Sequence, residues 1–352
     1  MAEMKNNFWS NKKVFITGHT GFKGSWLTLW LNYLGAEIMG YSLPVSKNEY
    51  LFKKLKLKSQ FKIKSIFGDI NNLNYLKKNI KNFKPDIVFH LAAQPIVIDS
   101  YKRPIKTLNT NIIGTANLLE SCIKIDNLKS IVIITTDKCY ENNDSHNNFK
   151  EKDKLGGDDP YSASKAACEI ITNSYSKSFL SSVGIATARS GNVIGGGDRG
   201  KERLVTDIIS SIKYNKILNL RNPRSTRPWQ HVFETLNGYI MLGEKLYNNR
   251  TKFNGPWNFG PSHKKISTKD IAKKISKLWG KDIIFNYPSK AQFKEKKYLS
   301  LNSKKSNTKL KWKNKFSLDE TIFQIVEWEK QTLNKKDLYE YSLKQLIDFI
   351  KK

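Results

Sequence analysis

The chain has few cysteines, few arginines and no long apolar segment. Its three cysteines, Cys122, Cys139 and Cys168, do not have the spacing of metal ligands. No run of about 18 apolar residues occurs, so no membrane-spanning helix is expected. The N-terminal residues lack the apolar core of a secretory signal. The sequence therefore predicts a cytoplasmic protein with reduced thiols and no metal site.

Acidic residues are also scarce, which leaves the chain strongly basic. There are 31 Asp and Glu against 61 Lys and Arg, a net charge of +30. Such a balance is typical of nucleic-acid-binding proteins. The lysines, however, are spread along the whole chain, and no basic segment matches a known nucleic-acid-binding module. We therefore expect no nucleic-acid partner.

The arginines are distributed differently from the lysines. Only eight occur, and six of them lie in 189–227: Arg189, Arg199, Arg203, Arg221, Arg224 and Arg227. A guanidinium group is a planar fork that matches a phosphate better than an ammonium does. This cluster therefore predicts a phosphate-binding region.

A glycine-rich turn near the N-terminus predicts a nucleotide site. Residues 13–17 (K-V-F-I-T) have the composition of a short strand, and Gly18, Gly21 and Gly24 follow it in a G-x-x-G-x-x-G pattern. Apolar residues then recur at helical spacing up to Tyr33. A strand, a glycine turn and a helix N-terminus together present backbone N–H groups to a pyrophosphate. We therefore expect dinucleotide binding here.

Alternating apolar segments predict the fold class. Further strands are expected at 37–41, 62–67, 86–90, 130–135 and 185–189, and helices at 107–122 and 161–180. This alternation is typical of an α/β protein with a doubly wound, Rossmann-type parallel sheet. We expect residues 1–188, with about 228–256, to form the cofactor-binding domain. Residues 189–352 are expected to form mainly a smaller, interleaved C-terminal substrate domain.

Two strand ends bear on the choice of cofactor. The second strand runs into Tyr41, Ser42 and Leu43, with neither the carboxylate that holds the ribose of NAD nor an arginine for a 2′-phosphate. Asp69 follows the third strand, where it could accept a hydrogen bond from adenine or cap the next helix. The small residues Ala92 and Ala93 follow the fourth strand, where a cofactor could approach closely.

The segment 135–165 carries the candidate catalytic groups. Thr136, Asp137 and Lys138 follow the fifth strand, and Tyr161 and Lys165 lie four residues apart on a predicted helix. That spacing places both side chains on one helix face. A neighbouring ammonium favours the phenolate, which would make Tyr161 a general base for an alcohol.

Several motifs together resemble one enzyme family. They are G-H-T-G-F-K-G-S-W-L, H-L-A-A, T-T-D-K-C-Y-E-N, D-D-P-Y-S-A-S-K-A-A-C-E, S-G-N-V-I-G-G-G-D and T-R-P-W-Q-H-V. In order and spacing, from residue 14 to about 261, the chain resembles the extended short-chain dehydrogenase/reductase family. Within that family it is most similar to the nucleotide-sugar 4,6-dehydratases of the branch that acts on CDP-glucose.

The resemblance implies a redox-neutral dehydration with tightly bound NAD. Tyr161 would deprotonate the sugar 4-hydroxyl, Thr136 would hydrogen-bond it, and Lys165 would lower the pKa of the tyrosine and hold the nicotinamide ribose. Asp137 would protonate the departing 6-hydroxyl. Lys138 stands where related dehydratases carry a glutamate base. Whether it removes the C5 proton or only positions the substrate is left open.

The resemblance also implies the remaining contacts. The cofactor would be held by Gly18, Thr20, Gly21, Phe22, Gly24, Asp69, Ile70, Leu91, Ala92, Ala93, Tyr161 and Lys165. The substrate would be held by Gln94, Asn192, Arg203 and Arg227, while Trp229 and His231 pack or orient. A homodimer or homotetramer in deoxysugar and O-antigen lipopolysaccharide synthesis is expected. A 4-epimerase, a dehydratase for another nucleotide sugar and an inactive nucleotide-binding protein are the alternatives.

Overall fold

A seven-stranded parallel sheet forms the centre of the protein. The computed structural model describes residues 8–352 except 46–49, 60–61, 143–147, 201, 263–265, 289–297 and 335–336. The strands are β1 (Lys13–Thr17), β2 (Glu37–Ser42), β3 (Ile63–Phe67), β4 (Ile87–His90), β5 (Ser130–Ile134), β6 (Gly184–Ser190) and β11 (Gly255–Phe259). Their order is β11-β6-β5-β4-β1-β2-β3, and all neighbours are parallel. The predicted doubly wound sheet is confirmed, with its switch point between β1 and β4.

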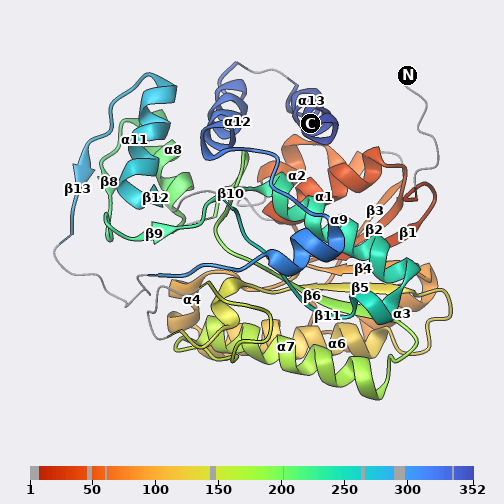
Figure 1. The fold of residues 1–352 in the computed structure, drawn as a ribbon. Helices are drawn as coiled ribbons and strands as arrows, with labels where there is room; N and C mark the ends of the chain where they lie inside the picture. Colours follow the sequence, from red (N-terminus) through yellow and green to blue (C-terminus); the bar gives the residue numbers. More distant parts are fainter. Residues whose placement is uncertain are drawn as a thin grey trace.

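Helices cover both faces of this sheet (Figure 1). One face carries α1 (Phe22–Tyr33), α9 (Val232–Asn248) and α13 (Leu338–Lys351), and the other carries α3 (Leu73–Phe83), α6 (Gly114–Ser121) and α7 (Pro160–Ser178). Successive side chains of a strand point to opposite faces. Accordingly, Val14 and Ile16 of β1 belong to the core on the α1 side, whereas Phe15 belongs to the core on the α7 side.

The helix predicted at 107–122 is divided into three segments. These are α5 (Pro104–Leu108), a wide π-type turn at Asn109–Ile113, and α6. The wide turn places the Asn111 amide between two other elements. Its Nδ2 donates to Ser164 Oγ at 2.8 Å, and its Oδ1 accepts from the Gln94 backbone N–H at 2.8 Å. The interruption therefore links the loop after β4 to α7.

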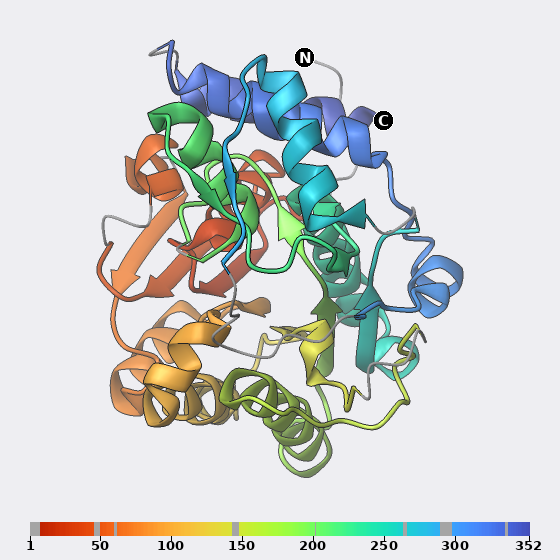
Figure 2. The ribbon, with the colours of Figure 1, turned by 90° about the vertical axis from the view of Figure 1, so that its left-hand side faces the viewer.

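A second, smaller lobe holds its own core. It is built from α8 (Leu204–Tyr214), α11 (Thr268–Trp279) and one side of α12 (Leu318–Gln331), around Ile208, Ile212, Ile271, Ile275 and Ile325. Short strands join it: β8 (Leu218–Asn219), β9 (Thr226–Arg227), β12 (Ile266–Ser267) and β13 (Phe285–Asn286). Figure 2 shows α12 and α13 crossing the molecule on the side opposite α7.

The chain passes between the two lobes more than once. β11 completes the sheet and extends three residues past the expected boundary near residue 256, and α13 packs against α1 and α9. The remaining short elements are α2 (Tyr50–Lys54), α4 (Val97–Lys102), β7 (Val193–Ile194), β10 (Gln230–His231) and α10 (Arg250–Phe253). Among the described residues, no helix is both long enough and apolar enough to cross a membrane.

A buried carboxyl group fixes the C-terminal segment to α9. Glu234 Oε1 accepts from the backbone N–H groups of Lys315 (2.9 Å) and Phe316 (2.7 Å), and Oε2 has no hydrogen-bond partner among the described residues. Burial raises the pKa of Glu234 to about 7, against the opposing effect of these N–H groups and of Lys315 and Lys352. The folded state therefore favours the protonated carboxyl group.

This raised pKa makes stability depend on pH. Since the folded pKa of Glu234 lies above the unfolded one, its contribution is complete below the unfolded pKa and is lost as pH rises through about 7. Glu234→Gln removes this titration. We expect the free energy of unfolding of the variant, relative to the wild type, to rise by up to about 3 kcal/mol between about pH 5 and about pH 8. Urea unfolding at both values measures it, and a constant difference would contradict it.

Candidate active site

A cleft of about 910 Å³ lies beyond the carboxyl ends of the sheet strands. Its walls come from the glycine turn after β1, the ends of β3, β4 and β5, the start of α7, and the loop and helix that follow β6. In parallel sheets, ligands bind at this edge and near the switch point. Within the described part of the chain, no group of three His, Cys, Asp or Glu side chains is placed to hold a metal ion.

The glycine turn fits a dinucleotide. Gly18 has φ +72°, and a Cβ on it would lie 2.7 Å from the Ala92 backbone nitrogen. A Cβ on Gly24 would lie 2.0 Å from the Gly18 carbonyl oxygen. In the described part of the chain, the N-cap of α1, Gly21, provides no side-chain cap, which leaves the N–H groups of the first turn available to a phosphate. Thr20 and Phe22 line the cleft beside them.

The other expected cofactor contacts also line this cleft: Asp69, Ile70, Leu91, Ala92 and Ala93. Asp69 does not cap the next helix, because Asn72 is the N-cap of α3 and accepts from Tyr75 N–H at 3.0 Å. At the end of β2, the Ser42 hydroxyl hydrogen-bonds Thr20 Oγ1 (2.9 Å) and His19 Nδ1 (3.2 Å). It is therefore engaged with the glycine turn itself.

The backbone turns directly after β5. A short 3₁₀ helix at Asp137–Cys139 begins with Thr136 as its N-cap. As a result Thr136 and Lys138 both line the cleft, while the side chain of Asp137 is buried behind them. Thr136 Oγ1 donates to Asp137 Oδ1 at 3.1 Å. A Cβ on cleft-lining Gly191 would lie 2.8 Å from Asp137 Oδ2.

Burial determines the protonation of the central groups. It raises the pKa of Asp137, against the opposing charges of Lys138, Arg227 and Lys23. It also raises the pKa of Tyr161, although a hydrogen bond with Thr136 opposes this. Both groups therefore favour their protonated forms. The protonated phenol differs from the phenolate expected from the Tyr161–Lys165 spacing.

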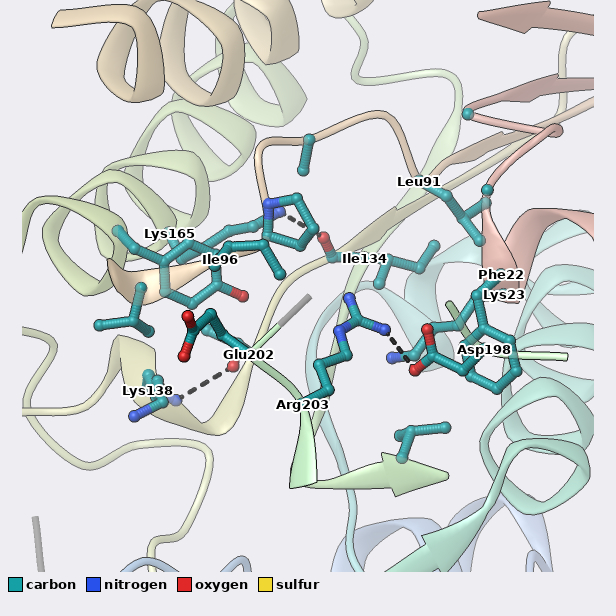
Figure 3. A pocket seen from close by; sticks show the side chains of 18 of the residues that line it. Phe22, Lys23, Leu91, Ile96, Ile134, Lys138, Lys165, Asp198, Glu202 and Arg203 are labelled. Atoms are coloured by element: carbon teal, nitrogen blue, oxygen red, sulfur yellow. Dashed lines mark hydrogen bonds and ion pairs between the residues drawn. The ribbon is translucent and has the colours of Figure 1, made fainter. Parts of the chain in front are cut away.

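Lys165 accounts for this difference. Its Nζ donates to the main-chain carbonyl of Ile134 at 3.1 Å (Figure 3) instead of pairing with the phenol. Burial lowers the pKa of Lys165. The structure thus brings Thr136, Tyr161 and Lys165 to one wall, as expected, but the charge of the lysine is directed toward the backbone.

Lys23 is a site residue that the sequence interpretation missed. Its Nζ donates to Ser190 Oγ (3.0 Å) and to Tyr239 OH (3.3 Å), and the residue lines the cleft. Burial lowers its pKa to about 7, with Arg203 acting in the same direction and Asp137 and Asp198 opposing. The sequence offered one signal for this role: Lys23 lies between Phe22 and Gly24 of the turn that follows the strand. A charged side chain at that position lies near the carboxyl edge of the sheet, where the ligand is expected.

The arginine cluster is mostly used in ion pairs and not held ready for phosphate. Arg189 pairs with Glu169, Arg199 with Glu329, Arg203 with Asp198 (2.7 Å; Figure 3) and Arg221 with Glu202. Of the expected substrate contacts, Asn192, Arg203 and Arg227 line the cleft. Arg221 lines the cleft as well, so three of the six arginines of the cluster lie where a phosphate group could meet them.

Gln94 has a different place from the one expected. Its Nε2 donates to Ile96 O (3.1 Å) and Thr107 Oγ1 (2.8 Å), and its Oε1 accepts from Ile96 N (2.5 Å). It is not among the cleft-lining residues. Because the amide is used within its own loop, Gln94 shapes the loop after β4.

Trp229 lines the cleft and also packs in the second core.

A buried polar network supports the catalytic wall from behind. Glu169 on α7 accepts from Thr135 Oγ1 (2.5 Å) and Thr187 Oγ1 (2.5 Å) and pairs with Arg189 (2.8 Å). Arg189 also donates to Tyr140 OH at 2.6 Å. Glu169 lies four positions after Lys165 on α7, and Thr135 directly precedes Thr136. The network therefore fixes β5, β6 and α7 relative to each other.

The glycine loop after β6 is held by the C-terminal helix α12. Trp26 Nε1 donates to Gly196 O at 3.1 Å, and a Cβ on Gly196 would lie 2.4 Å from the Trp328 ring. Glu329 then accepts from Arg199 (2.7 Å) and from Lys213 (2.6 Å). This loop leads to Arg203, so α12 sets the position of one wall of the cleft.

The Glu169–Arg189 pair yields a stability prediction. Arg189→Met leaves a buried carboxylate without its cation, which costs about 3–5 kcal/mol. Arg103→Met, which breaks the exposed pair with Asp99, is the matched control and should cost no more than about 1 kcal/mol. Urea unfolding measures both. Adding Glu169→Gln to Arg189→Met should recover part of the loss, and equal effects of the two arginine variants would contradict the argument.

Comparison with known proteins identifies the family. A model of the GDP-mannose 4,6 dehydratase family matches residues 15–325. The chain is 42% identical over 352 residues to a CDP-glucose 4,6-dehydratase of Salmonella typhimurium, covering 98% of each chain. It is 32% identical to a dTDP-D-glucose 4,6-dehydratase of Dictyostelium discoideum, over 75% of this chain and 61% of that one. The fold matches a dTDP-glucose 4,6-dehydratase structure from Bacillus anthracis (TM-score 0.79, 22% identity, 92% and 98% coverage). The chain belongs to the GDP-mannose 4,6 dehydratase family.

Proposed function

We propose that this protein is an NAD-dependent CDP-glucose 4,6-dehydratase, which forms CDP-4-keto-6-deoxyglucose and water from CDP-glucose. One observation carries the proposal: Asp137, a buried carboxyl group whose pKa burial raises, lies next to the Thr136–Tyr161 pair. Such an acid is needed to expel a 6-hydroxyl group as water, whereas inversion at C4 does not require one. The full-length similarity to the Salmonella typhimurium CDP-glucose enzyme supports the choice of substrate.

The cofactor assignment has support from the glycine turn. The B. anthracis structure is a complex with NAD, and Gly18 and Gly24 leave the backbone space that a pyrophosphate needs. Bound NAD would accept a hydride from C4 of the glucose and return it to C6, so that the overall reaction is redox-neutral. Asp69 would accept a hydrogen bond at the adenine end.

The roles of the catalytic residues follow from their placement. Thr136 and Tyr161 would hold the sugar 4-hydroxyl, and Tyr161 would take its proton. Because burial raises the pKa of Tyr161, this step needs added positive charge. Lys165 is the source we propose, after its ammonium group leaves the Ile134 carbonyl. Asp137 would then protonate the departing 6-hydroxyl.

Lys138 takes one of two roles. It lines the cleft one residue after Asp137, on the same 3₁₀ turn. As a base it would remove the C5 proton that the 4-ketone acidifies. As a positioning group it would only contact a substrate oxygen. The variants described below separate these roles.

We further propose a cytoplasmic homodimer or homotetramer that acts in deoxysugar synthesis for lipopolysaccharide. Exposed apolar side chains on the α5–α7 layer support self-association: Ile105, Ile113, Ile170 and Phe179. Product analysis with CDP-, dTDP-, UDP- and GDP-glucose tests the activity directly. The 4-keto product absorbs in alkali, and a 4-epimer as the product would refute the dehydratase.

Tyr161→Phe removes only the hydroxyl group of a buried ring. We expect the variant to fold and to bind NAD but to form the 4-keto product about 10²–10⁴ times more slowly, because the positioned base is lost. Tyr175→Phe on the same helix is the matched control and should keep normal turnover. Comparable rates for the two variants would rule out Tyr161 as the base.

Asp137→Asn and Lys138→Ala should stop the reaction at different steps. Both variants keep Thr136, Tyr161 and Lys165, so both should oxidise C4 and accumulate bound reduced cofactor, detected by its absorbance. Asp137→Asn should still exchange the C5 hydrogen with deuterated solvent, because only the leaving-group acid is missing. Lys138→Ala should exchange it very slowly if Lys138 is the base. Wild-type exchange in Lys138→Ala would leave Lys138 as a positioning residue.

A further inference from the structure

The second lobe contributes to the cleft wall a carboxylate, that of Asp207, with no partner in the described part of the chain. Asp207 lies on α8, and Thr206, Asn219, Arg221 and Thr268 line the same part of the cleft. Within the described residues, no hydrogen bond or ion pair is made by the Asp207 side chain. The other cleft carboxylates are engaged: Asp198 with Arg203, Glu202 with Arg221, and Asp69 with the Asn71 N–H groups.

The surroundings of Asp207 favour a hydrogen-bond donor from a ligand. The side chain is half-buried, and burial together with the nearby Glu202 raises its pKa to about 6, against the opposing effect of Arg221. At neutral pH it is therefore mostly a carboxylate with unmet acceptor capacity. A phosphate group offers only acceptors and would be repelled. The ligand group that meets Asp207 must be neutral or cationic and must carry N–H or O–H.

The position of Asp207 along the cleft indicates which part of the ligand it contacts. Arg203, the N-cap of α8, influences the pKa values of Tyr161 and Lys23 and so lies toward the reacting end. Asp207 follows it by four residues, which corresponds to about 6 Å further along the helix axis. In a nucleoside diphosphate sugar, the ribose and then the base follow the diphosphate. With the diphosphate at Arg203 and Arg227, Asp207 lies at the nucleoside end.

We propose that Asp207 recognises the base of the substrate by accepting a hydrogen bond from the exocyclic amine of cytosine, and so selects cytidine over uridine and thymidine nucleotides. The inference rests on the proposed function. Cytosine carries an amine donor at position 4, where uracil and thymine carry a carbonyl acceptor, and a carboxylate is the acceptor that suits this amine. The 4-carbonyl oxygen of uracil or thymine would instead lie against the carboxylate of Asp207. Both groups are acceptors, so no hydrogen bond could form and the two would repel each other.

Binding of free nucleotides tests this without catalysis. In the NAD-loaded enzyme, calorimetry should show tighter binding of CDP than of UDP. Asp207→Asn, whose amide can donate to a carbonyl, should lower the CDP-to-UDP affinity ratio by about 5- to 150-fold. Asp282→Asn, at an exposed aspartate of the same lobe, is the matched control and should leave the ratio unchanged.

A ligand-side measurement keeps the test valid if Asp207→Asn does not fold. CDP with two methyl groups on the exocyclic amine has no donor there, and its affinity for the wild-type enzyme should fall by the same factor relative to CDP. An equal loss of CDP and UDP affinity in Asp207→Asn would overturn the proposal and indicate a ribose contact. An unchanged ratio, or a wild type without preference for CDP, would also overturn it. Failure of the proposed function would show separately, as CDP binding without 4-keto product from any nucleotide glucose.

Discussion

The buried ion pair between Glu169 and Arg189 is the interaction that holds the wall of the cleft carrying Thr136, Tyr161 and Lys165. Two charges removed from water must satisfy each other, and here they also take up the hydroxyl groups of Thr135, Thr187 and Tyr140. Because these partners come from β5, β6, α7 and the turn after β5, none of these elements can shift without exposing a charge to an apolar interior. The candidate catalytic residues Thr136 and Lys165 are held in place by the same network, because they lie close to Thr135 and Glu169 in the chain.

On the cleft side of the same wall, burial favours the neutral forms of the ionisable groups. Burial favours a neutral carboxyl on Asp137 and a neutral phenol on Tyr161, and it lowers the pKa of Lys165 and Lys23. The network behind is charged, whereas burial disfavours the charged forms of the groups in front. Lys23 is the group among them whose pKa, about 7, lies near neutral pH.

The sequence predicted the sheet well because its signals are local. A buried parallel strand is a short apolar run, and the glycine turn requires glycine at positions where a Cβ would meet backbone. The site was predicted partly by pattern and partly by resemblance. What could not be predicted depends on contacts distant in sequence: the pairing of four arginines with carboxylates, the use of Gln94 in its own loop, and the Lys165–Ile134 contact. The wide turn at Asn109–Ile113 is a further case, because helical periodicity does not reveal it.

The contact of Trp328 with Gly196 gives the C-terminal helices a part in the shape of the cleft. The motifs quoted from the sequence end near residue 261, yet α12 packs against the glycine loop that carries one of them, S-G-N-V-I-G-G-G-D, and Glu329 pairs with Arg199 directly after it. The C-terminal segment that contains α12 thus helps to set the conformation of this loop. A substitution in α12 can therefore alter the shape of the cleft without contacting a bound ligand.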